Sequence, residues 1–163
     1  MIEIQVEDAG WLAVLPEAER LAIGAAEASL AALPTPTAGD LVILLTNDAE
    51  VRDLNARFRD KDQPTNVLSF PAGDNPHGHL GDVALALGVC AAEAAAQGKP
   101  LAHHLQHLVA HGVLHLVGYD HLNDGEAETM EALEREILAT LGVPDPYVDW
   151  LDGSPPPFGA DHA

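Results

Sequence analysis

The segment DLVILLTNDAE, residues 40–50, combines a predicted strand with the start of a predicted helix. Residues 40–46 form a short apolar run with β-branched members, which is typical of a buried strand. Asn47 follows as a helix N-cap, and the acid Glu50 three residues later completes a capping box. This segment therefore predicts a buried strand that leads directly into a helix over 48–58.

Comparable patterns surround this segment on both sides. Alternating or short apolar runs predict three more strands, at 1–8, 65–71 and 80–87. Helix formers between proline and glycine boundaries predict further helices at 16–33, 88–98, 100–117 and 124–141. Strands come early and helices dominate later, so the expected class is α+β, with a small mixed β-sheet of about four strands covered by about five helices.

Length and composition indicate one domain. No repeat or linker divides the 163 residues, so residues 1–150 are expected to form a single domain and the proline-rich residues 151–163 a frayed tail. The one cysteine, Cys90, excludes an internal disulfide and fits a reducing compartment. Because no apolar run reaches the roughly 18 residues of a membrane span, and no signal peptide is visible, the expected location is the cytoplasm.

The chain is strongly acidic. Seven basic residues stand against 26 acidic ones, giving a formal net charge of −19, which argues against nucleic-acid binding because Lys and Arg bind phosphates. Four of the seven basic residues nevertheless lie within 52–61, and they are Arg52, Arg57, Arg59 and Lys61. This basic segment can attract an anion locally, or it can be a solvated helix face with i,i+4 ion pairs.

The segment HGVLHLVGYDH, residues 111–121, has the residues of a metal site. His111 and His115 are four residues apart on a predicted helix, so both rings project from one face. Gly118 can end that helix in a left-handed conformation and return His121 to the same point. Three neutral imidazoles suit one Zn²⁺ and leave a fourth position for water, as in catalytic zinc sites.

Other interpretations of the histidine-rich helix stay open. The three histidines can be packing or capping residues. We expect His107 to be a core group or to support a metal ligand, and His104 to lie at the surface. Some zinc peptidases use the spacing HExxHxxGxxH, in which the catalytic glutamate follows the first histidine. Gly112 stands at that position here, so a peptidase would lack its base.

Three segments together resemble the YbeY family of bacterial endoribonucleases and ribosomal RNA maturation factors. They are HLVAHGVLHLVGYDH at 107–121, FRDKDQPTNVLSFP at 58–71 and HLGDVAL at 79–85, in the family's order, and the likeness covers about residues 40–142. The resemblance implies an α+β fold, one zinc on His111, His115 and His121, and a functional arginine at Arg59. It also implies cleavage of single-stranded RNA in maturing the 3′ end of 16S ribosomal RNA, and a role in ribosome quality control.

The resemblance also implies partners, which are the small ribosomal subunit, one of its proteins and the GTPase Era. RNA supplies its own nucleophile, the 2′-hydroxyl, and zinc lowers the pKa of a bound water to about 7, so a separate glutamate base is not required. Direct attack of a zinc-bound hydroxide on the phosphorus is equally compatible with the sequence. We expect Arg59 to stabilise the charge on the reacting phosphate. Two alternatives remain, a metallopeptidase and a non-catalytic ribosome-assembly factor stabilised by zinc.

Overall fold

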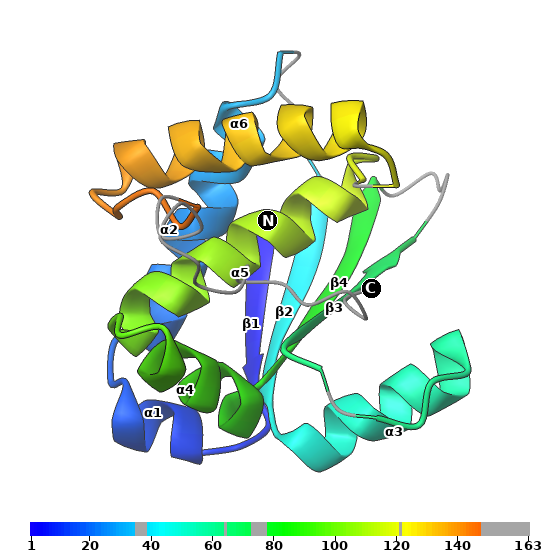
Figure 1. Ribbon diagram of the computed structural model, residues 1–163. Coiled ribbons are helices and arrows are strands. Elements are labelled where there is room, and N and C mark those ends of the chain that lie inside the picture. The colour runs from blue at the N-terminus through cyan, green and yellow to red at the C-terminus, as the bar shows by residue number, and fades with distance from the viewer. Residues whose placement is uncertain (35–38, 64, 73–77, 121, 148–163) are drawn as a thin grey trace.

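The computed structural model describes residues 1–34, 39–63, 65–72, 78–120 and 122–147 (Figure 1). The four strands in these ranges form one sheet in the order β1-β2-β4-β3, and they are β1 (Ile2–Val6), β2 (Asp40–Thr46), β3 (Val67–Pro71) and β4 (His79–Ala86). Strand β2 pairs in parallel with β1 and β4, whereas β3 runs antiparallel to β4 at the sheet edge. The predicted mixed sheet is therefore confirmed.

Within the described ranges the chain forms six helices. They are α1 (Gly10–Val14), α2 (Ala18–Ala31), α3 (Asp48–Arg59), α4 (Leu87–Ala96), α5 (Leu101–Leu116) and α6 (Asp124–Thr140). The predicted α+β class is confirmed, and the short helix α1 is the one that the sequence did not reveal. It has no side-chain cap. The indole of Trp11, which donates a hydrogen bond to the Thr46 carbonyl at 2.8 Å, ties it instead to the end of β2.

The two faces of the sheet carry different helices. On β4, Val83 and Leu85 pack with α5 in the main core, while the alternating Ala84 and Ala86 pack with Val51 of α3. Because side chains alternate across a strand, α5 and α3 cover opposite faces. Figure 1 shows α5 crossing the sheet, with α6 alongside it.

None of the helices in the described ranges is long and apolar enough to cross a lipid bilayer. The proline-rich tail that was predicted at 151–163 lies outside the described residues.

Candidate metal centre

Helix α5 places His111 and His115 one turn apart near its C-terminal end. Gly118 follows with a φ of 103°, and the Tyr119 backbone N–H donates to the Leu114 carbonyl, so the chain leaves the helix where the sequence predicted. His111 is 3% exposed, and His115 is half-buried. The helix end therefore presents one buried and one accessible imidazole to the same region.

The two rings meet through their Nε2 atoms. These nitrogens are 3.0 Å apart, and the ring planes are at 81°. Two nitrogens that bind one tetrahedral zinc ion at about 2.0–2.1 Å lie about 3.3 Å apart. The observed pair is close to that separation, so these residues fit two ligands of one metal ion.

The third predicted ligand, His121, lies outside the described residues. Among the residues that the structure describes, no group of three His, Cys, Asp or Glu side chains could hold a metal ion. The structure therefore brings His111 and His115 together, and the complete three-histidine site stays a prediction.

A buried carboxylate lies behind His111. Glu134 of α6 is 0% exposed, and its Oε2 atom is 3.0 Å from the His111 Nδ1. Its Oε1 atom is 2.6 Å from the His107 Nε2 and accepts a 2.6 Å hydrogen bond from the Tyr147 hydroxyl. Histidines that bind metals commonly donate their second ring N–H to a carboxylate in this way. The hydrogen bond between His111 and Glu134 therefore fits a metal-binding histidine.

Burial and hydrogen bonding set the protonation of this cluster. Burial alone would raise the pKa of Glu134, but the charge of His111 and the hydrogen bonds from His107 and His111 hold it well below its usual value. Burial lowers the pKa of His107 to about 4, although Glu134 opposes that shift. Glu134 is therefore an ionised carboxylate beside a neutral His107 at pH 7.

Sequence analysis missed Glu134 and Tyr147. One signal was available, because Glu134 shares the apolar stripe of α6 with Met130, Ile137 and Leu138. An acid on the buried face of an amphipathic helix needs a polar partner. His107, which was expected to be a core group or to support a ligand, is one of its partners.

The expectation that His104 lies at the surface is wrong. The residue is 0% exposed, and its Nε2 is 2.9 Å from Glu93 Oε1, which also accepts from the Asn66 side chain. Helix α5 packs against the sheet, α2, α4 and α6, so little of its surface around His104 faces solvent. Burial lowers the pKa of His104, and its hydrogen bond to Glu93 opposes the shift.

Gly112 faces the sheet. A Cβ atom at this position would lie 2.7 Å from Val83 Cγ1 and 3.2 Å from Ser69 Oγ. A larger residue at this position requires the buried Val83 side chain to shift, so the packing here disfavours the glutamate base of an HExxH peptidase. This contact is a physical reason for the glycine that follows His111.

Gly112→Ala is expected to lower the free energy of unfolding by about 1–3 kcal/mol, the usual cost of overpacking a core. Urea unfolding followed by circular dichroism measures it. Gly125→Ala is the matched control, because a Cβ there meets only Asn123 Oδ1 at 3.4 Å. Equal stability of the two variants would show that α5 can move away from β4 at no cost.

Arg59 is held at the edge of the sheet. It ends α3, on the face opposite α5, and its Nη2 donates a 2.9 Å hydrogen bond to the Ser69 carbonyl of β3. The Ser69 hydroxyl in turn donates to the Gly112 carbonyl of α5 at 3.0 Å. Among the described residues, Arg59 therefore makes no hydrogen bond to His111 or His115. One residue of an edge strand links the arginine to α5.

A groove of about 700 Å³ runs beside Arg59. Its lining residues come from β2, α3, β3 and β4, and they are Leu44, Leu54, Arg57, Phe58, Arg59, Ser69, Phe70, Pro71 and Asp82. Two members of the basic segment are paired with acids, since Arg57 contacts Asp53 at 2.9 Å and Arg52 contacts Asp62 at 2.8 Å. The expected anion-attracting role therefore falls mainly on Arg59 and Lys61.

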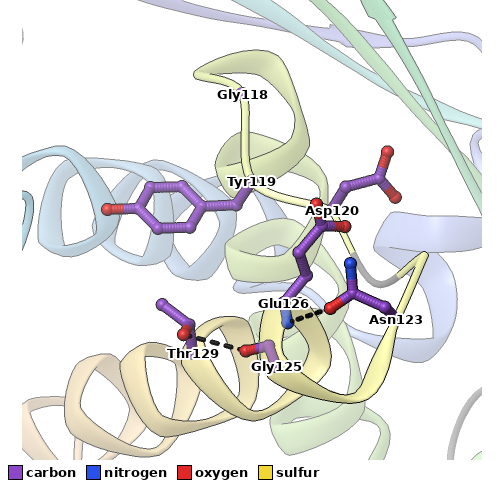
Figure 2. A pocket seen from close by; sticks show the side chains of 7 residues that line it. All are labelled: Gly118, Tyr119, Asp120, Asn123, Gly125, Glu126 and Thr129. Atoms are coloured by element: carbon purple, nitrogen blue, oxygen red, sulfur yellow. Dashed lines mark hydrogen bonds between the residues drawn. The ribbon is translucent and has the colours of Figure 1, made fainter.

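A second hollow, of about 400 Å³, adjoins the turn between α5 and α6 (Figure 2). Its lining residues are Gly118, Tyr119, Asp120, Asn123, Gly125, Glu126 and Thr129. Asn123 caps α6 by accepting a hydrogen bond from the Glu126 backbone at 2.9 Å. This cap fixes the start of α6 beside the hollow.

The fold and the histidine pair define an α+β protein with a candidate metal site on a buried helix. The sequence model of the family described as "Endoribonuclease YbeY" matches residues 8–142. Proteins named endoribonuclease YbeY from Azorhizobium caulinodans and Maricaulis maris are 55% and 50% identical to this chain, over 90% of it in each case and over 95% and 91% of the relatives. The chain therefore belongs to the YbeY family.

A solved structure has a similar fold. The solution structure of TM1509 from Thermotoga maritima superposes with a TM-score of 0.54 at 22% sequence identity, covering 87% of this chain and 92% of that one. At this identity the likeness concerns the fold alone. It agrees with the α+β architecture described above.

Proposed function

We propose that the protein is a zinc-dependent endoribonuclease that cleaves single-stranded RNA in the 3′-end maturation of 16S ribosomal RNA. Membership of the YbeY family and the names of its relatives support the endoribonuclease activity. The observation that carries the metal dependence is the pair of Nε2 atoms 3.0 Å apart on His111 and His115. The Glu134 carboxylate lies 3.0 Å from the second ring nitrogen of His111, a partner that metal-binding histidines commonly have.

In this proposal His111, His115 and His121 hold one zinc ion. Three histidine ligands would leave one coordination position for water, and zinc would lower the pKa of that water. The half-buried His115 leaves the zinc site accessible to a large substrate, while the buried His111 fixes the position of the zinc site. Ser69, hydrogen-bonded to the Gly112 carbonyl, ties the site to the edge strand.

Arg59 is proposed to bind the phosphate next to the cleaved bond. In the described part of the chain its guanidinium makes one hydrogen bond, through Nη2 to Ser69, which leaves other N–H donors of the planar fork for phosphate oxygens. The groove beside it also holds the exposed ring of Phe58, a surface on which a base can stack. A flexible single strand could follow this groove around the edge strand towards the histidines.

Acidic composition bears on how RNA is recruited. With a net charge of −19 and two arginines of the basic segment 52–61 paired with carboxylates, the protein is expected to bind RNA weakly by itself. We therefore propose recruitment to the small ribosomal subunit through protein contacts, with a subunit protein and the GTPase Era as the partners that the family resemblance suggests.

A non-catalytic assembly factor is the second candidate, and the same acidic surface favours it. In that case the histidines hold a structural zinc. A metallopeptidase is disfavoured because Gly112 stands where the glutamate base would be, and its contact with the buried Val83 side chain disfavours a larger residue there.

Purified protein loaded with zinc is expected to cleave a single-stranded RNA that carries the precursor 3′ end of 16S ribosomal RNA. Activity should disappear with a chelator and return with added zinc. Denaturing gel electrophoresis measures cleavage, and a 2′,3′-cyclic phosphate on the product would identify internal attack by the 2′-hydroxyl. If the protein binds tightly to precursor small subunits but cleaves RNA neither alone nor in their presence, the assembly-factor alternative is favoured.

A further inference from the structure

We propose that Glu134 is a positioning residue of the metal centre, which fixes the ring orientation and tautomer of His111, and that Tyr147 holds Glu134 in place. The proposal rests on the metal site proposed above, but the tautomer that it specifies is a property of the metal-free protein. It assigns a role to a residue of α6 and to one in the segment that follows α6.

The hydrogen bonds around Glu134 determine where the ring protons lie. Carboxylate oxygens accept hydrogen bonds, and three groups that can donate face Glu134, which are the His111 Nδ1, the His107 Nε2 and the Tyr147 hydroxyl. His111 therefore carries a proton on Nδ1, 3.0 Å from Oε2, and turns its Nε2 towards the Nε2 of His115. His107 likewise carries its proton on Nε2. The carboxylate thus presents the His111 nitrogen that a metal would bind.

Charge gives the carboxylate a second effect. Glu134 is fully buried, so solvent screens its charge only weakly. The His111 ring separates Glu134 from the point where its Nε2 and that of His115 meet. A cation at that point would be attracted by the carboxylate through the ring, and the ring nitrogen would become a stronger electron donor.

Tyr147 closes this cluster from the C-terminal side. Its hydroxyl donates to Glu134 Oε1 at 2.6 Å, and the residue is 6% exposed. Its backbone N–H donates to Asp145 Oδ1 at 2.8 Å, and Asp145 binds the Arg135 guanidinium at 3.1 Å. The same Arg135 lies 5.2 Å from the centre of the Tyr147 ring. The segment after α6 is therefore fastened to α6 at the level of Glu134.

This closure lies beyond the family match, which ends at residue 142. Residues 144–147 would thus add a stabilising contact to a site whose proposed ligands all lie within the match. A simpler explanation is that Glu134 only joins α6 to α5. The two explanations differ in what happens to His111 in a variant that keeps its fold.

Glu134→Gln and Tyr147→Phe test the proposal. In metal-free protein, long-range ¹H–¹⁵N NMR spectra should show His111 with its proton on Nδ1, and Glu134→Gln should shift it towards the other tautomer or a mixture. Competition with a chromophoric chelator should show zinc affinity reduced about 10–100-fold by Glu134→Gln, and reduced less by Tyr147→Phe. The exposed Glu128→Gln on the same helix is the matched control.

The outcomes separate this proposal from the proposed function. If Glu134→Gln lowers only the melting temperature, while the His111 tautomer and zinc affinity of the folded protein match the control, Glu134 is structural and the positioning role is overturned. If Tyr147→Phe changes neither readout, its part in holding Glu134 is overturned. If the tautomer changes as expected but His111→Ala leaves zinc binding intact, the carboxylate does orient His111, and it is the assignment of the metal site that fails.

Discussion

His115→Ala is expected to remove about one equivalent of zinc per chain and to abolish most RNA cleavage. Of the two proposed ligands that the structure describes, His115 is the better choice because it is half-buried, whereas His111 is 3% exposed and hydrogen-bonded to Glu134. Loss of a catalytic metal removes several kcal/mol of transition-state stabilisation, which corresponds to a rate lower by about a thousandfold. Metal analysis by mass spectrometry and a single-turnover cleavage assay measure the two effects.

His103→Ala is the matched control for this experiment, since it changes a half-buried histidine of the same helix that lies outside the site. It should keep its zinc and its activity. If His115→Ala retains a full equivalent of zinc, the ligand assignment is wrong. If the variant loses zinc and unfolds, the metal is structural and the assembly-factor alternative gains.

The fold could be predicted from the sequence because its elements have local signals. The apolar run at 40–46 is the buried strand β2, and Asn47 caps α3 by accepting from the Glu50 backbone, as the capping box predicted. Helix α1 has no such signal, since Trp11 holds it through contacts with β2. The sheet order was also out of reach, because the insertion of β4 between β2 and β3 depends on pairing between distant segments.

The site could be predicted only in part, for a related reason. The four-residue step between His111 and His115 is local, so a helix was enough to bring the rings together. Glu134 is 23 residues from His111, and only the packing of α6 on α5 makes it a partner. The prediction that His104 lies at the surface was wrong for the same reason, because the burial of a helix face depends on which elements cover it.

Arg59→Ala is expected to lower the turnover number for RNA cleavage by about 10²–10³-fold, the usual cost of removing a donor that stabilises transition-state charge. Zinc content should not change, because within the described residues Arg59 is connected to α5 through Ser69 and not through His111 or His115. Arg59→Lys should restore part of the activity, since it keeps the charge but loses the planar fork. Steady-state kinetics on a single-stranded RNA, with a melting curve for each variant, measures the effect.

Whether Arg59→Ala changes kcat or KM shows which role Arg59 has. A residue that only attracts the phosphate backbone would raise KM, make binding less sensitive to salt and leave kcat unchanged. A residue that stabilises the reacting phosphate lowers kcat. Arg52→Ala is the matched control on the same helix, where the guanidinium is bound to Asp62 at 2.8 Å. Because Arg59 approaches from the face opposite α5, an unchanged kcat would mean that the edge strand separates it from the chemistry and that the groove serves binding alone.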